Sequence, residues 1–121
     1  MKLLDTNFIS SLFNPDDVNH TRAKEIMFSI SDEEKVRVPY VVGAELSISE
    51  DGEKYLYAAR QITSKFVSNS EQDLDYIINL PAKSRAKLKA NDCLLLALCK
   101  RLNAEILTFD KVLLKIQESL G

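Results

Sequence analysis

Three aspartates in this 121-residue chain stand where carboxylates could do chemistry together. Asp5 and Asp110 each follow a short apolar run and precede a helical pattern, and Asp92 opens another helical pattern. Each of them could simply cap a helix, because hydrogen bonding and the helix dipole favour Asp at helix starts. In a parallel sheet, however, Asp5 and Asp110 would project from the same carboxyl edge.

Glu45 has a different setting, because its neighbours at helical spacing are apolar. At about 100° per residue, its side chain falls in an arc with Val41, Ala44 and Ile48. A carboxylate buried without a partner costs several kcal/mol or takes up a proton. We therefore expect Glu45 to face inward toward a cation, the alternative being an edge position from which its long side chain reaches water.

Together, Asp5, Glu45, Asp92 and Asp110 predict a cluster of oxygen ligands for a hard divalent cation such as Mg²⁺ or Mn²⁺. Without such an ion, converging carboxylates would repel one another and raise one another's pKa. Clusters of this kind are typical of phosphodiester hydrolysis, in which the ion lowers the pKa of a bound water and stabilises charge on the phosphate. We expect these four residues to be both metal-binding and catalytic.

Other kinds of site have little support in the sequence. Cys93 and Cys99 do not have C-x-x-C spacing and are expected to be buried free thiols. With one histidine, His20, expected at the surface, neither a zinc site nor a Ser-His-Asp triad is predicted. The glycine-rich motifs of nucleotide-binding proteins are absent from the sequence.

Charge is distributed unevenly, although the formal net charge is only −2. Residues 83–101 contain six bases and one acid. Lys83, Arg85, Lys87 and Lys89 recur at every second position, which fits an extended or loosely turned connector better than one helical face. We expect these four cations to hold backbone phosphates beside Asp92, the alternative being a solvated connector.

Strand and helix patterns alternate along the chain, and they must position these residues. Strands are expected at 2–4, 36–38 and 104–109. Helices are expected from about residue 6 to 13, at 19–30, after Pro39, at 53–66, around 74–78, at 92–102 and from 110 to about 120. This alternation predicts an α/β fold with a parallel sheet between helices. The chain has no repeat or linker, so we expect one domain over residues 1–121.

The sequence also predicts a cytoplasmic protein that does not bind membranes. It has no apolar run near the roughly 18 residues that cross a bilayer. Asp5 interrupts the first apolar residues too early for a signal peptide.

Four segments in order resemble the PIN-domain family, and within it the small toxins of the VapC type. Leu3-Leu4-Asp5-Thr6-Asn7 is similar to the family's first strand and the polar residues after it, and Val42-Gly43-Ala44-Glu45-Leu46 resembles the segment with its helical glutamate. Residues 88–97 and 103–110 are similar to its carboxyl-terminal signature, which ends in Thr-x-Asp. The resemblance covers essentially the whole chain, although family members commonly add an edge strand after the last helix and this chain stops at Gly121.

The resemblance implies a three-layer α/β/α sandwich with a central parallel sheet of about four short strands. It implies a Mg²⁺- or Mn²⁺-dependent endoribonuclease, the toxin of a type II toxin–antitoxin pair, with the four acidic residues as its site. Thr6, Asn7 and Thr108 would orient carboxylates or bound water, and the basic segment would contact RNA. The implied partners are an RNA substrate, a cognate antitoxin and a second copy in a homodimer.

Two alternatives remain open at the level of sequence. One is a PIN-like domain that binds RNA or protein without cleaving, against which an inward-facing Glu45 argues. The other is an α/β phosphatase or receiver-type domain that uses Asp5 as nucleophile or phosphoacceptor, although Asp5-Thr6-Asn7 lacks the second nearby acid such sites generally use.

Overall fold

The computed structural model describes residues 1–63 and 65–120. Three short strands, β1 (Lys2–Leu4), β2 (Val36–Arg37) and β3 (Glu105–Leu107), form a parallel sheet in the order β2-β1-β3. The helices are α1 (Thr6–Phe13), α2 (His20–Ser29), α3 (Tyr40–Ser47), α4 (Gly52–Ile62), α5 (Gln72–Ile78), α6 (Ala82–Arg85), α7 (Ala90–Leu102) and α8 (Lys111–Leu120).

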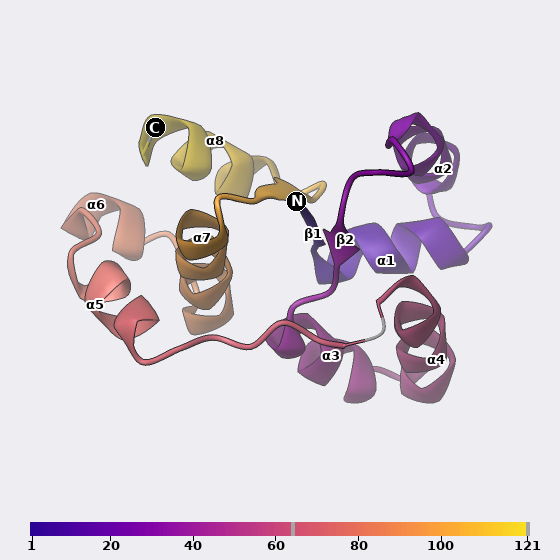
Figure 1. Cartoon of the computed structure of the whole chain (residues 1–121), viewed down its shortest axis with the longest axis horizontal. Helices are drawn as coiled ribbons and strands as arrows, with labels where there is room; N and C mark the ends of the chain where they lie inside the picture. Colours follow the sequence, from indigo (N-terminus) through magenta and orange to yellow (C-terminus); the bar gives the residue numbers. More distant parts are fainter. Residues whose placement is uncertain (64, 121) are drawn as a thin grey trace.

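The central strand β1 divides the molecule into two apolar layers. Successive side chains of a strand point to opposite faces of the sheet, and both Leu3 and Leu4 are fully buried. Leu4 packs with residues of α1, α3 and α4, whereas Leu3 packs with residues of α7 and α8. Helices α1 to α4 and helices α5 to α8 accordingly lie on opposite sides of the strands in Figure 1. The predicted α/β class with helices on both faces of a parallel sheet is confirmed.

The expected sheet of about four strands is smaller in the structure, which has three within the described residues. A fourth segment reaches the sheet edge only through a single parallel bridge between Pro39 and Val67. The Val67 N–H donates to the Val38 carbonyl at 3.0 Å, and the Tyr40 N–H donates to the Val67 carbonyl at 2.8 Å. Pro39 has no N–H to extend this ladder, and α3 begins at Tyr40, so the pairing stops after one residue.

The helix predicted over 53–66 is shorter in the structure, and Ser64 lies outside the described residues. It begins at Gly52 and ends at Ile62, because Thr63 is extended and its buried hydroxyl donates to the Lys65 carbonyl. Phe66 therefore reaches the core from the following loop. Its ring lies against Gly43, where an added Cβ would come within 3.0 Å of the Phe66 ring.

A buried ion pair joins α5 to the end of α7. Asp73 is 1% exposed, and its two carboxylate oxygens accept from the Arg101 guanidinium at 3.0 and 3.3 Å. Burial raises the pKa of Asp73, but hydrogen bonds from Arg101, Ser70 and Asn69 outweigh it and hold the pKa below its ordinary value. The sequence does not predict this pair, because its partners are 28 residues apart.

Three residues outside the acidic set behave as structural groups. The predicted buried thiols are confirmed at Cys93 and Cys99. His20 does not simply lie at the surface, because its Nδ1 is 2.9 Å from the Ser11 carbonyl oxygen and so ties α2 to α1. None of the helices described here is both long and apolar enough to span a membrane.

Candidate active site

Asp5 lies at the carboxyl edge of the sheet, directly after β1, and begins α1. Its Oδ1 accepts from the Thr6 N–H at 2.7 Å, so it caps α1 as the sequence allows. Its backbone N–H donates to the Leu107 carbonyl at 3.0 Å, which fixes it beside the end of β3. Asp5 as a whole is 8% exposed.

A polar network joins the ends of β1 and β3. The Thr108 hydroxyl donates to Asp5 Oδ2 at 2.7 Å, and the Asn7 amide donates to Thr108 Oγ1 at 3.1 Å. Asn7 Oδ1 in turn accepts from the Phe109 N–H at 2.9 Å, and the Phe109 ring stacks on Phe8 of α1 at 5.5 Å. Asn7 in the first turn of α1 and Thr108 directly after β3 thus fix the orientation of the Asp5 carboxylate.

Glu45 reaches the carboxyl edge of the sheet from α3. Its neighbours on that helix are not buried in the way that the sequence predicts. The buried face of α3 carries Val42, Gly43 and Leu46, while Ala44 is exposed and Ile48 is 87% exposed. Glu45 lies at the edge of that buried face and is half-buried. The predicted apolar arc is therefore wrong, and Glu45 takes the edge position that was the alternative.

The carboxylate of Glu45 is nevertheless tied to the network around Asp5. The Thr6 hydroxyl donates to Glu45 Oε1 at 3.0 Å, while the Thr6 backbone N–H donates to Asp5. One residue therefore bridges two of the four predicted acids.

Asp92 lies in the first turn of α7, where its Oδ2 accepts from the Lys89 N–H at 3.3 Å. The helix begins at Ala90, two residues earlier than expected. The carboxylate is half-buried and adds negative charge near Asp5.

Asp110 is connected to the network mainly through its backbone. Its N–H donates to Thr108 Oγ1 at 3.1 Å, while its Oδ1 accepts from the N–H groups of Val112 and Leu113 at 3.0 and 3.1 Å. The side chain thus caps α8. Its charge is not among those that raise the pKa of Asp5, unlike the charges of Glu45 and Asp92.

The electrostatics of Asp5 reveal how closely the acids are gathered. Burial is the main cause that raises the pKa of Asp5, and the charges of Glu45 and Asp92 raise it further. Hydrogen bonds from Thr108 and Thr6 oppose this shift without cancelling it. Three carboxylates therefore share a region of negative potential at the sheet edge, which a bound cation would relieve.

The donor chemistry at this edge fits a hard divalent ion, but the side chains do not form a closed cage. Carboxylate oxygens are the ligands that Mg²⁺ and Mn²⁺ prefer. Across residues 1–63 and 65–120, no three His, Cys, Asp or Glu side chains lie close enough together to chelate an ion. Asp5, Asp92 and Asp110 each direct one oxygen to a helix start instead, and Glu45 accepts from Thr6.

The basic segment is not the extended connector that its spacing predicts. Lys83 and Arg85 lie in the short helix α6, Lys87 lies in the turn after it, and only Lys89 is extended. All four side chains are exposed. The last residue of the segment still lies beside Asp92, because the Lys89 N–H donates to the Asp92 carboxylate.

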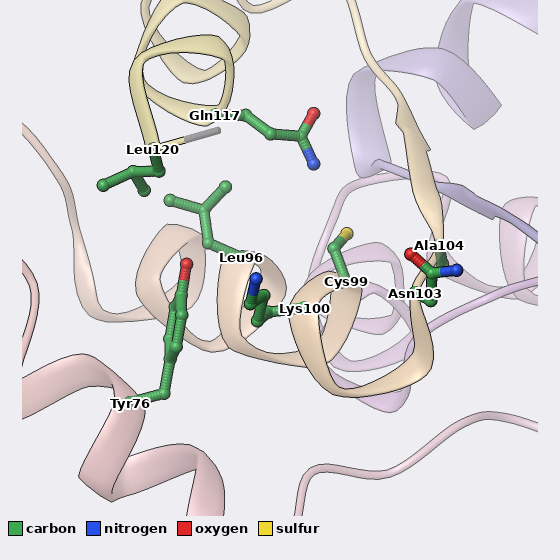
Figure 2. Close-up of a pocket in the computed structure, with 8 residues that line it drawn as sticks. All are labelled: Tyr76, Leu96, Cys99, Lys100, Asn103, Ala104, Gln117 and Leu120. Carbon is green, nitrogen blue, oxygen red and sulfur yellow. The ribbon is translucent and has the colours of Figure 1, made fainter.

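A separate cavity of about 200 Å³ lies between α5, α7 and α8. Figure 2 shows Tyr76, Leu96, Cys99 and Gln117 around it, and none of its lining residues is acidic. Burial raises the pKa of Cys99 to about 12, with a smaller contribution from the charge of Asp5, so this thiol stays protonated at neutral pH. The acidic edge and this cavity are therefore different sites.

These features define a class of protein: a small α/β domain with a three-stranded parallel sheet and acidic side chains at its carboxyl edge. A family model described as PIN domain matches residues 2–119, so the chain belongs to the PIN-domain family. The resemblance seen in the sequence is thereby confirmed.

Solved structures of similar fold share little sequence with this chain. FitAcB from Neisseria gonorrhoeae superposes with a TM-score of 0.72 at 18% identity, covering 98% of this chain and 94% of that one. The structure of FitAB bound to an IR36 DNA fragment superposes with a TM-score of 0.71 at 18% identity, covering 98% of this chain and 91% of that one. VapC20 from Mycobacterium tuberculosis, described as a toxin that cleaves the sarcin–ricin loop, gives 0.70 at 17% identity, covering 100% and 95%. A search by sequence among proteins of curated function found no match.

Proposed function

We propose that this chain is a divalent-metal-dependent endoribonuclease. The observation that carries the proposal is the shared negative potential of Asp5, Glu45 and Asp92 at the carboxyl edge of a PIN-domain sheet. VapC20, which cleaves the sarcin–ricin loop, has the same fold, and this supports RNA as the substrate. A domain that only binds RNA would have no use for three carboxylates that repel a phosphate backbone.

Asp5, Glu45 and Asp92 would hold Mg²⁺ or Mn²⁺, and Asp110 would take part more weakly because its charge does not contribute to the raised pKa of Asp5. When bound, such an ion lowers the pKa of a water and stabilises charge on the scissile phosphate. Asn7 and Thr108 keep the Asp5 carboxylate oriented, and Thr6 holds Glu45 toward it. The chain's own contribution is to fix these oxygens on two strand ends and two helices.

We further propose that the chain is the toxin of a toxin–antitoxin pair, working in the cytoplasm as one domain, with an antitoxin and a second copy of itself as partners. The structures of FitAcB and VapC20 support the proposal through their fold. Arg85 and Lys89 would contact RNA next to Asp92, since both are exposed on the segment that leads to it.

An RNA cleavage assay with Mg²⁺, with Mn²⁺ and with EDTA tests the proposed function. We expect cleavage that requires a divalent ion and that falls by about 10- to 100-fold in Glu45→Gln, because loss of a charged ligand weakens the site for the ion on which cleavage depends. This substitution keeps the volume of the side chain and its contact with Thr6, and it removes only the charge.

The matched control is Glu50→Gln, which removes a charge from an exposed position beyond α3. It should cleave like the wild type. Cleavage that persists in EDTA, or a Glu45→Gln variant as active as the control, contradicts the proposal.

A further inference from the structure

A second charged feature lies between α6 and the carboxyl-terminal half of α8. It is a cleft of about 310 Å³ lined by three lysines, Lys83, Lys87 and Lys115, together with two serines and Ile116. Figure 1 shows α6 next to the end of α8, although more than twenty residues and all of α7 separate the two helices in the chain. The fold therefore brings Lys115 next to the basic segment.

The helical start of this segment explains why only part of it faces the cleft. Lys83 and Lys87 are four residues apart across α6 and its following turn, a spacing that places two side chains on one face. Arg85 lies between them in the sequence but is not among the residues that line the cleft. The four cations of the segment thus divide between two surfaces.

The lysines of the cleft are not neutralised within the protein. In the part of the chain that the structure describes, no salt bridge involves Lys83, Lys87 or Lys115, whereas Arg101 of the same basic stretch is paired with Asp73. All three lysine side chains are exposed. Three unpaired like charges around one cleft favour a polyanion, because each contact with a phosphate releases counterions.

The cleft is close to the acidic edge along the chain. Lys87 lies two residues before Lys89, whose N–H donates to Asp92 at 3.3 Å. Two residues of extended chain span at most about 7 Å. The two lysines of the basic segment that line the cleft and the carboxylate of Asp92 therefore lie on one short stretch of chain, residues 83–92.

We propose that this cleft binds the backbone phosphates of an RNA strand beside the point of cleavage, and that Lys115 of α8 is one of its contacts. The inference rests on the proposed function and extends its binding surface to an element that the basic segment does not include. The lining contains lysines but no arginine and no aromatic side chain. Such contacts recognise charge and position the strand without selecting its sequence.

The test is the salt dependence of binding to a single-stranded RNA oligonucleotide, measured in EDTA so that no cleavage occurs. Each phosphate contact contributes about 0.7 to the slope of log K against log salt concentration. We expect Lys115→Gln to reduce the slope by about 0.7. A triple variant that combines Lys83→Gln, Lys87→Gln and Lys115→Gln should reduce it by about 2. Lys115→Arg keeps the charge and should keep the slope.

The matched control is Lys24→Gln, which removes an exposed lysine from α2 on the other side of the sheet. It should leave the slope unchanged. DNA of the same sequence should show the same dependence on the three lysines, whereas millimolar inorganic phosphate should compete only weakly. A Lys115→Gln variant whose slope equals that of the control overturns the proposal, and so does binding that free phosphate abolishes.

Cleavage separates this inference from the proposed function. Lys24→Gln, which changes neither the cleft nor the acidic edge, should cleave RNA at the wild-type rate. If the slope depends on the lysines but the wild type cleaves no RNA with any divalent ion, the cleft is an RNA surface and the nuclease assignment fails. If the wild type cleaves and the slope ignores Lys115, only the cleft proposal fails.

Discussion

At the scale of single residues, Asp5 combines a structural role with the chemistry proposed for the site. One carboxylate oxygen caps α1 through the Thr6 N–H, and the other accepts from the Thr108 hydroxyl. Burial and the charges of Glu45 and Asp92 nevertheless raise its pKa. The ionised form is therefore held at a cost to the folded state when no cation is bound.

This cost predicts how the stability of the protein in EDTA varies with pH. The pKa of Asp5 is higher in the folded protein than its ordinary value of 3.8, so the folded state binds the proton more tightly than the unfolded state does. The contribution of Asp5 to the free energy of unfolding is complete below pH 3.8 and is lost as pH rises through the raised folded value.

Asp5→Asn should lack this loss, because Asn caps helices about as well as Asp and does not ionise. Thermal unfolding from pH 4 to pH 8 should show the melting temperature of the wild type falling relative to that of Asp5→Asn. Parallel curves for the two proteins would mean that Asp5 is not strained by burial and neighbouring charge.

At the scale of elements, the buried pair of Asp73 and Arg101 keeps α5 against the end of α7. The Arg101 guanidinium also donates to the Ser68 carbonyl at 2.9 Å, so one side chain secures the loop before α5 as well. The same helix carries Asp92 in its first turn. The pair therefore contributes to the stability of an element on which the candidate site depends.

Arg101→Met should lower the free energy of unfolding by about 3 kcal/mol, because it leaves the buried Asp73 carboxylate without its cation. Urea unfolding measures this change. Lys100→Met is the matched control, since Lys100 is the exposed neighbour on α7 and its loss should cost less than about 0.5 kcal/mol. Equal unfolding free energies for the two variants would show that the pair has no stabilising role.

At the scale of the whole molecule, the sequence predicts the parallel sheet and its polar edge well. Asp5 follows β1, and Thr108 follows β3, which ends at Leu107 and not at Phe109 as expected. Parallel strands bring the residues at their carboxyl ends together, and a hydrogen bond of 2.7 Å joins these two. The end of α7 at Leu102 is equally well predicted. Asn103, which follows it, adopts a left-handed conformation with φ of 50°, and Asn tolerates this conformation.

Other features depend on packing that a local pattern does not contain. The helix α3 has apolar residues on several of its faces. Their spacing alone therefore could not decide whether Ala44 and Ile48 or Val42 and Leu46 are buried. The approach of Lys115 to α6 likewise results from two helices that are distant in the chain. Both features are set by contacts between helices, which the spacing of residues within one helix does not reveal.

The central claim is that the carboxylates at the sheet edge form one divalent-metal site, and calorimetric titration with Mn²⁺ tests it most directly. The wild type should bind about one or two ions, as an oxygen-ligand site of this size allows. Asp92→Asn and Glu45→Gln should each weaken binding by about 10-fold or more, on the scale seen when residues at metal sites are replaced. Glu50→Gln should bind like the wild type. No heat of binding in the wild type, or equal affinities in Asp92→Asn and Glu50→Gln, would contradict the claim.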